Sequence, residues 1–533
     1  MTKGKVPAAT AHRVCILILA MFISVKADLA PAAEPPAAQP SSDADRAALL
    51  KIRELLQSGQ TQAALDAANA ALNQPGPAGV APAAPATVPS VASNPPVFTS
   101  SPTSQPSQPA PPSAIAEATD VEQFSVHFQT TVISQKHAYV SADYSGPNSL
   151  QQRESTKTSL SATLFMGLRL PKDFGAIYFD PEVTGGEGLS GVTGIASFPN
   201  GDISHVGTPE PQPYVARAYY QKSFDLGGER EHVDSDANQL AGYQPEKRLT
   251  FTFGKVASPD FFDNNTYSHD PRTQFMNESL MDDSAWDYPA DTRGYTVGGV
   301  IEYNEPAWAV RYGAFQEPTQ ANGGSLDGHI PQALGHVLES EYRWTLGEQA
   351  GEVRPMAYIN TAHMGNYGEA IELGRATGTT PDVTATRTYS AKYGFSLSAE
   401  QAITADLGIW GRAGWNDGHT ESWAFTEVDR LGSLGISLKG TAWNRPDDVF
   451  GFAGAIAGLS NDHRDYLRDG GLGFIIGDGQ LNYAPEEVLE AYYLIKVAEH
   501  VFVTPDLQFV DHPAYNSDRG PVYIGGVRGH VEF

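Results

Sequence analysis

Side chains of alternating character run from residue 121 to the last residue, and this feature limits the possible folds more than any other. In the segment LSATLFMGLRL, Leu160, Leu164 and Leu168 share one parity, whereas Thr163 and Arg169 share the other. A β-strand directs successive side chains to opposite faces, so each such segment has one apolar and one polar face. A strand buried in a parallel sheet is instead apolar throughout. The sequence therefore predicts an all-β, antiparallel structure.

Further segments alternate in the same way, and the connections between them differ in length. The alternating segments include WAVRYGAF, LGIWGRAGW, LEAYYLIKV and VFVTPDLQF. Short turns at 304–307 and 498–500 contrast with long polar loops at 187–213 and 368–390. Short turns at one end and long loops at the other are typical of outer-membrane β-barrels, whose strands are apolar on one side only. Tyr and Trp recur near the strand ends, as membrane interfaces favour.

The final segment, PVYIGGVRGHVEF, predicts how such a barrel closes. Tyr523, Val527 and Phe533 fall on the apolar parity, and Arg528 and His530 fall on the other. In a membrane, lipid covers the apolar face, and the backbone can pair with the first strand. Many outer-membrane barrels end in a strand of this kind, so we expect the barrel-assembly machinery to recognise Phe533.

The composition and the N-terminal segment argue against several other classes of protein. The 533 residues carry a net charge of −27, which argues against a nucleic-acid partner. Lys3, Lys5 and Arg13 precede a short apolar run at 14–25, and we predict a signal peptide at 1–33. The lone Cys15 lies inside it, so the mature chain is expected to lack disulfides and thiolate metal sites. We expect no catalytic residues, metal or cofactor, because neither HExxH nor GxSxG occurs.

Two different segments precede the alternating region. Apolar residues at helical spacing, a break at SGQ and a stop at NQPG predict a periplasmic helical hairpin at 42–74. A single hairpin does not bury its own apolar face, so it either associates with itself or a periplasmic partner, or remains a fluctuating spacer. Residues 75–115, rich in Pro, Ala and Ser, predict a linker. The transmembrane barrel is expected at 121–533.

One segment of the alternating region resembles a known family. FTFGKVASPDFFDNNTYSHDPRTQFMNESLM is similar to the signature segment of the carbohydrate-selective porin family, which is called OprB-like. EEVLEAYYLIKVAEHVFVTPDLQFV resembles the penultimate hairpin of that family, and GGVRGHVEF resembles its closing strand. HFQTTVISQKHAYVSADYSGPNSLQ resembles its start. The resemblance covers essentially 121–533 and implies a barrel of about sixteen strands that passes sugars.

A sugar channel needs hydrogen-bonding side chains and aromatic faces on its inner wall, with binding weak enough to allow release. Residues opposite the apolar parity are therefore candidates for lining the pore and contacting substrate. They are Arg169, Arg311, Arg412, Arg528, Glu302, Glu490, Asp406, Asp506, Trp410 and Tyr492. The segment from Lys255 to Phe275 has two interpretations, an inward-folded loop that narrows the pore or an extracellular loop.

The function predicted from these observations is an outer-membrane porin for passive, selective diffusion of mono- and oligosaccharides, with the N-terminal extension in the periplasm. Sugars and outer-membrane lipid are the expected partners. One alternative is a barrel for polysaccharide export in which the N-terminal helices serve as a periplasmic adaptor. Another is a secreted carbohydrate-binding β-protein.

Overall fold

The computed structural model describes residues 121–203 and 209–533. The signal peptide predicted at 1–33, the helical hairpin at 42–74 and the linker at 75–115 lie outside the described residues. The first described strand begins at Phe124, close to the predicted start of the barrel at residue 121.

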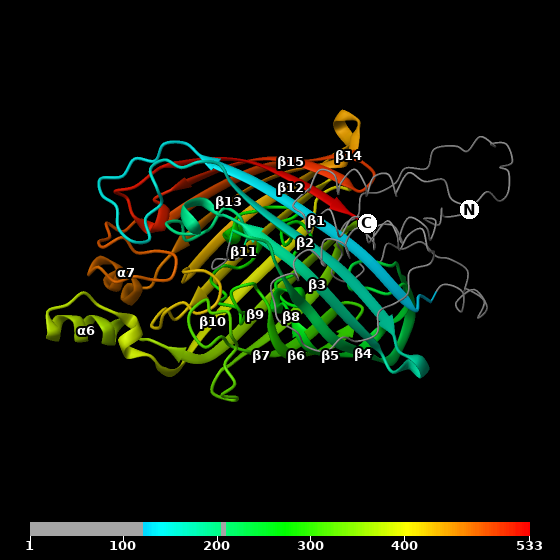
Figure 1. Cartoon of the computed structure of the whole chain (residues 1–533). Helices are drawn as coiled ribbons and strands as arrows, with labels where there is room; N and C mark the ends of the chain where they lie inside the picture. Colours follow the sequence, from blue (N-terminus) through cyan, green and yellow to red (C-terminus); the bar gives the residue numbers. More distant parts are fainter. Residues whose placement is uncertain (1–120, 204–208) are drawn as a thin grey trace, which may run out of the picture. The chain divides into compact units, whose positions relative to one another are not determined.

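Sixteen antiparallel strands form one closed barrel, in which each strand pairs with its neighbours in the chain (Figure 1). The closed sixteen-stranded architecture predicted from the sequence is confirmed. The strands are β1 Phe124–His137, β2 Lys157–Arg169, β3 Ala176–Gly186, β4 Gln212–Val233, β5 Gly242–Val256, β6 Thr296–Glu305, β7 Trp308–Gln316, β8 Leu334–Leu346, β9 Gln349–Met364, β10 Thr388–Ala402, β11 Leu407–Asn416, β12 Arg430–Gly440, β13 Arg445–Gly458, β14 Glu486–Ala498, β15 Val501–Asp511 and β16 Val522–Glu532.

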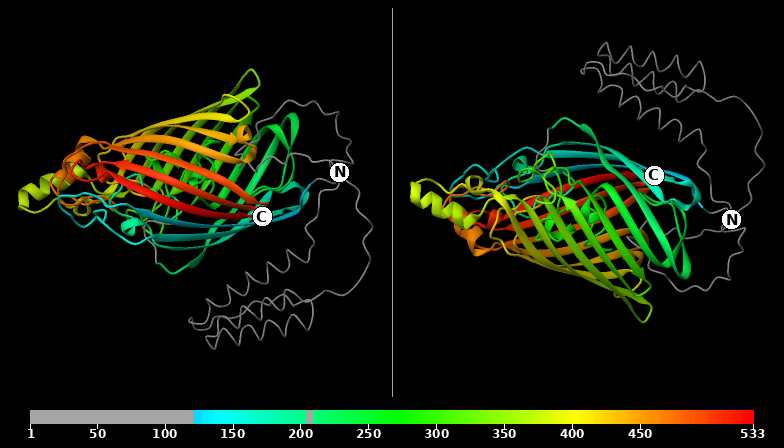
Figure 2. Two further views of the ribbon diagram at one scale, coloured as in Figure 1. Left: turned by 90° about the horizontal axis from the view of Figure 1, so that it is seen from above. Right: turned by 90° about the horizontal axis from the view of Figure 1, so that it is seen from below.

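The last strand closes the barrel against the first. Gln129 of β1 is in register with Glu532 of β16, and the pairing continues to His137 and Ile524. The Phe533 amide donates a hydrogen bond to the Phe128 carbonyl at 2.8 Å. Every strand therefore has two neighbours, and the sheet leaves no open edge. Figure 2 shows this wall from two further directions.

The two faces of the wall follow the parity of the sequence. On β7, the Tyr312 side chain is 43% exposed on the outside, whereas Arg311 beside it is 5% exposed on the inside. On β16, Val527 faces outward, and Arg528 is buried within the barrel. An apolar outer band with a polar interior is the arrangement that lipid imposes on a membrane barrel.

The connections alternate in length around the barrel, as the sequence predicts. Turns such as 306–307 and 347–348 join strands at the end where β16 finishes. Long loops, among them 257–295 and 459–485, join them at the other end, where α6 and α7 lie (Figure 1). We call these the short-turn end and the long-loop end.

Short helices occur within these connections. They are η2 Pro171–Asp173, η3 Leu189–Gly191, η4 Ser258–Asp260, α5 Glu278–Met281, α6 Tyr367–Thr377, η5 Val383–Thr386, η6 Thr441–Trp443, α7 Asn461–Arg468 and η7 Pro513–Tyr515. In the part of the chain that the structure describes, none of the helices has both the length and the apolarity needed to cross a bilayer.

The segment 368–390, expected to be a polar loop, contains helix α6 apart from its first residue, Tyr367. The Asn366 side chain caps the helix by accepting a hydrogen bond from the Glu369 amide at 3.0 Å. Gly378 ends it in a left-handed conformation with φ of 68°. Tyr367, Ala370 and nearby Ile371 form the buried face, so tertiary packing stabilises a helix that the strand pattern of the surrounding sequence did not indicate.

Candidate functional site

The connection between β5 and β6, residues 257–295, folds into the barrel; we call it the inward loop. Phe262, Phe275 and Trp286 of this loop are fully buried although they belong to a connection rather than a strand. The loop is hydrogen-bonded to inward-facing side chains of strands from β8 to β16. Of the two interpretations of the segment from Lys255 to Phe275, the structure therefore shows the inward-folded loop.

Two buried arginines hold the backbone of the inward loop. Arg412 on β11 pairs with Asp263 at 2.9 Å and donates to the Leu280 carbonyl at 2.9 Å. Arg528 on β16 donates to the carbonyls of Pro271 and Gln274 at 2.6 and 2.7 Å. A guanidinium has five donors in a rigid fork, so one side chain can fix several loop carbonyls at once.

The same wall, between β11 and β16, also holds the inward loop through an acid and two aromatic rings. Glu490 on β14 accepts hydrogen bonds from the amides of Met276 and Asn277 at 2.7 and 2.9 Å. The Phe275 ring lies 5.4 Å from the Trp410 ring and 4.9 Å from the Tyr492 ring, near perpendicular to the latter. Edge-to-face contacts of this kind add to the apolar burial. The loop is therefore fastened to the wall rather than suspended in the lumen.

The inward loop carries carboxyls with altered acidity. Burial, together with the negative charge of Asp263, raises the pKa of Asp283 to about 7. The pKa of Asp263 is also raised by burial, against the opposing effect of Arg412. Burial acts to raise the pKa of Asp270, but the charges of Arg272 and His530 and hydrogen bonds from the Arg272 amide and the Thr273 hydroxyl together lower it. Because burial in the packed loop raises the pKa of both Asp263 and Asp283, packing of the loop favours the protonated form of these carboxyls.

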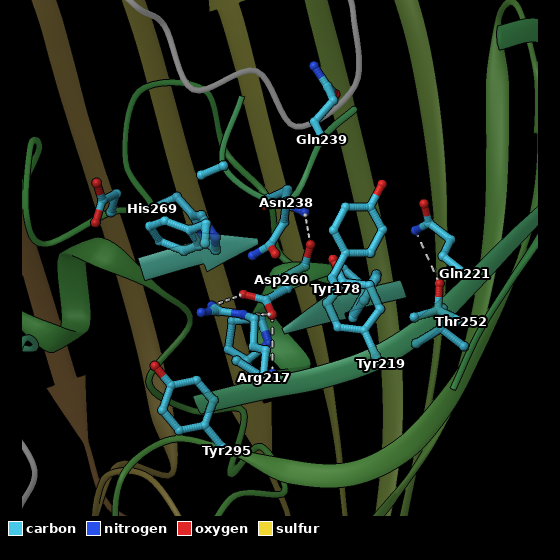
Figure 3. A pocket seen from close by; sticks show the side chains of 18 of the residues that line it. Tyr178, Arg217, Tyr219, Gln221, Asn238, Gln239, Thr252, Asp260, His269 and Tyr295 are labelled. Carbon is cyan, nitrogen blue, oxygen red and sulfur yellow. Dashed lines mark hydrogen bonds and ion pairs between the residues drawn. The ribbon is translucent and has the colours of Figure 1, made fainter. Parts of the chain in front are cut away.

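A cavity of about 810 Å³ lies between the inward loop and the wall formed by β2–β7; we call it the main cavity. Its lining includes Asn238 and Gln239 from a short turn, and Asn322 and Phe425 from long loops. The cavity therefore extends along the barrel from the short-turn end toward the long-loop end. Figure 3 shows Arg217, Tyr219 and other side chains that line it.

Charges in the main cavity are held in close pairs. Arg217 on β4 forms a two-pronged ion pair with Asp260, at 2.7 and 2.5 Å (Figure 3). Arg272 of the inward loop pairs with Asp202 at 2.8 Å. Further along, Arg311 pairs with Glu302 at 2.5 Å and also with Glu339 and Glu341, which do not line the cavity, at 3.0 and 2.7 Å. Paired charges expose hydrogen-bond donors and acceptors without a strong field of one sign.

Tyrosine side chains lie between these pairs. The rings of Tyr178 and Tyr219 stack with centroids 4.9 Å apart at an interplanar angle of 24° (Figure 3). Tyr295 lies 5.9 Å from Tyr214, and the Arg217 guanidinium lies 5.3 Å from the Tyr295 ring centroid. Burial raises the pKa of Tyr295, so its hydroxyl stays protonated and donates to Glu182 at 2.9 Å. The cavity therefore combines fixed hydroxyls with apolar ring surface.

The ten residues predicted to line the pore fall into three groups. Arg169, Glu302 and Arg311 line the main cavity. Arg412, Arg528, Glu490, Asp506, Trp410 and Tyr492 face the interior but lie under the inward loop, where all except Asp506 contact it directly. Asp406 lies in the turn before β11, where it accepts a hydrogen bond from Thr441 at 2.9 Å. Their role as sugar contacts stays a prediction.

Sequence reasoning missed the residues at the centre of the main cavity, above all Tyr178, Arg217 and Tyr219. The pairing of β3 with β4 shifts register between Asp180 and Pro181, so simple parity fails along β4. Tyr178 on β3 could have been found by the alternation that identified the other candidates. Asp260 lies within the segment that carries the family resemblance.

The described residues, 121–203 and 209–533, contain no group of three or more His, Cys, Asp or Glu side chains that could hold a metal ion.

The chain is similar to known porins in sequence and in structure. Residues 148–533 match the sequence profile described as "Carbohydrate-selective porin, OprB family". Porin AaxA of Chlamydia abortus is 23% identical over 289 residues, which are 54% of this chain and 54% of that protein. The match thus spans about half the length of this curated relative.

A solved structure shows the same fold. Pseudomonas putida OprB at high pH is 18% identical, with a TM-score of 0.57, over 77% of this chain and 94% of that one. The low-pH structure of the same porin is 14% identical, with a TM-score of 0.40, over 77% and 93%.

Proposed function

This chain belongs to the carbohydrate-selective porin family OprB, and on that premise we propose that it lets mono- and oligosaccharides cross the outer membrane by passive, selective diffusion. Family membership and the closed barrel indicate a channel rather than an enzyme, and they point to the outer membrane. The proposal adds the substrate class, the passive mechanism and a periplasmic N-terminal extension. The solute passes through the main cavity between the inward loop and β2–β7.

The observation that carries the proposal is the pairing of charge along the main cavity. Arg217 with Asp260, Arg272 with Asp202, and Arg311 with Glu302 place opposite charges within 3 Å of one another. Such pairs offer hydrogen bonds to a hydroxyl-rich solute, because each hydroxyl both donates and accepts. An ion would instead be attracted by one partner and repelled by the other. The lining therefore favours an uncharged polar solute.

The tyrosines of the main cavity complement these pairs. A sugar ring has apolar C–H faces between its hydroxyls, and an aromatic ring offers a matching surface. Tyr178 and Tyr219 lie beside Gln221 and Thr252, whose side chains are hydrogen-bonded to each other at 3.3 Å (Figure 3). Contacts of moderate strength spread along a passage permit both capture and release, which conduction requires.

Liposome swelling tests this function with solutes that differ only in charge. Vesicles containing the purified protein are diluted into glucose, gluconate or glucosamine at equal osmolarity, with maltose and larger oligosaccharides to measure the size limit. We expect glucose to enter faster than its anionic and cationic analogues. Faster entry of gluconate or glucosamine would contradict selection for neutral sugars.

A pair of variants tests the role of the charge pairs. Arg217→Ala removes a guanidinium that faces Asp260, from a side chain only 13% exposed, whereas Arg230→Ala removes one from a side chain 55% exposed, which pairs with Asp225 at the rim. A hydrogen bond to a charged group contributes about 1.5–3 kcal/mol, so Arg217→Ala should weaken glucose block of single-channel current by about tenfold or more. Arg230→Ala should have little effect, because exposed pairs contribute little. Equal weakening of glucose block in the two variants would show that the Arg217–Asp260 pair has no special role in sugar binding.

A further inference from the structure

A second, smaller cavity opens at the long-loop end, where α6 and α7 lie (Figure 1). Its volume is about 190 Å³, and we call it the outer cavity. Four connections line it: 317–333, 365–387, 417–429 and 459–485. Exposed side chains at Gln320 and Thr384 form its rim, and buried ones form its floor. It can therefore be reached from outside the barrel.

We infer that the outer cavity is a binding site for a single sugar ring, occupied before the solute enters the main cavity. The inference rests on the proposed function and adds a site to it. The first argument is size, because a volume of about 190 Å³ lies below the range of about 300–1,000 Å³ typical of pockets for larger ligands. One ring suits this space better than a chain of rings.

The second argument is a buried hydroxyl without a partner. Ser422 on the floor of the outer cavity is only 2% exposed, and its Oγ makes no hydrogen bond within the described part of the chain. Buried polar groups are nearly always paired, and an exception calls for an explanation. A sugar hydroxyl in the outer cavity would supply the missing partner.

The third argument is the arrangement of further hydrogen-bonding groups above Ser422. Arg387 holds Glu421 in a two-pronged pair at 2.7 and 2.9 Å through Nε and Nη2, which leaves Nη1 without a partner among the described residues. The Gln320 side-chain amide at the rim likewise has no partner within the described part of the chain. Hydrogen-bonding groups without a partner among the described residues thus occur at three depths of the outer cavity: the Gln320 amide at the rim, Arg387 Nη1 below it and the Ser422 hydroxyl at the floor.

The remaining lining of the outer cavity combines apolar side chains, which fit the faces of a sugar ring, with Tyr367 and with Glu427, whose carboxylate accepts hydrogen bonds from the Ile475 and Ile476 amides at 2.8 and 2.9 Å. Val383, Leu472 and Phe474 contribute the apolar surface. A lining of apolar side chains with a few placed polar groups is typical of small-molecule sites. An anion would gain little here, since the charge of Arg387 is already neutralised by Glu421 and Glu427 adds a further carboxylate to the lining.

The outer cavity lies next to the main cavity in the chain. Ala321 and Ser422 line the outer cavity, whereas Asn322 and Ala424 line the main cavity. The two short segments are joined by a hydrogen bond from the Asn322 amide to the Trp423 carbonyl at 2.6 Å. These segments form the partition between the cavities, so a solute in the outer cavity is one step from the passage.

Ser422→Ala tests the inference without disturbing the fold, because the hydroxyl has no protein partner to lose. Glucose binding is measured on the full-length protein in detergent by saturation-transfer NMR titration. Loss of one neutral hydrogen bond should weaken binding about threefold to tenfold. Gln320→Leu at the exposed rim should also weaken it. The matched control is Ser433→Ala on β12, another buried serine without a partner among the described residues, which lines neither cavity.

The outcomes separate this site from the proposed function. Weaker glucose binding by Ser422→Ala, with parental binding by Ser433→Ala, supports the outer cavity as a sugar site. Parental binding by Ser422→Ala, or equal losses in both serine variants, overturns it. If the parent shows no saturable glucose binding although its liposomes swell in glucose, the site is wrong and the proposed function stands. If the parent shows neither saturable glucose binding nor swelling of its liposomes in glucose, the outer-cavity site and the proposed function are both wrong.

Discussion

Replacing Arg412 by Ala should release the inward loop from the wall of the barrel. The side chain pairs with Asp263 at 2.9 Å, and both side chains are almost completely buried. The same guanidinium donates to the carbonyls of Leu280 and Ser268 at 2.9 and 2.5 Å. Removing one member of a buried pair leaves an uncompensated charge and costs about 3–5 kcal/mol. The population of a released loop should therefore rise by a factor of about 150 to about 5,000.

Single-channel recording in planar bilayers measures this release. A detached loop would enter and leave the main cavity, so we expect frequent current transitions to a lower conductance in Arg412→Ala. Arg412→Lys keeps the charge but not the planar fork, and it should lie between the parent and the Ala variant. The folded fraction is checked by heat modifiability on gels, which separates loop release from failure to fold.

Arg519→Ala is the matched control for the effect of losing a buried arginine. Arg519 is 2% exposed and donates to the carbonyls of Tyr144 and Leu150 at 2.6 and 2.8 Å, so it fastens a different loop, 138–156. Its loss should leave conductance close to that of the parent. Parental conductance and noise in a folded Arg412→Ala barrel would refute the reasoning, because the loop would then be held without its buried ion pair.

Three further predictions concern the wall, the pH response and the closing strand. Tyr312→Arg places a charge against lipid at a cost of about 2–4 kcal/mol near the midplane, so the heat-modifiable folded fraction should fall. The control variant Tyr312→Phe should fold normally. If both variants fold normally, the Tyr312 side chain does not face lipid. The pKa of Asp283, raised to about 7, lies above its unfolded value, so the contribution of this group to the packing of the inward loop is fully present below about pH 4 and is lost as pH rises through 7. Current noise should rise over that range and lose this dependence in Asp283→Asn; a pH-independent parent would disprove the coupling. Phe533→Ala should lower the amount of folded barrel in the membrane, measured by fractionation, and insertion at the parental level would exclude this role for Phe533.

The sequence by itself determined the wall of the barrel. The alternation of residues in a strand is a local property with a period of two, so neighbours such as Arg311 and Tyr312 could be assigned to opposite faces without knowing their partners. The predicted export signal, the short turns and the final strand then indicated that lipid covers the apolar face. The same reasoning placed Arg412 and Arg528 inside, where the structure has them.

Only the tertiary structure decided what the inward-facing residues do. Arg412 and Asp263 are separated by 149 positions in the sequence, and no local pattern relates them. The shift of register between β3 and β4 brings Arg217 and Tyr219 into the main cavity against simple parity. The outer cavity needs four loops that meet only when the barrel closes. Strand faces follow from near neighbours in the chain, whereas sites follow from contacts between distant segments, which only closure of the barrel brings together.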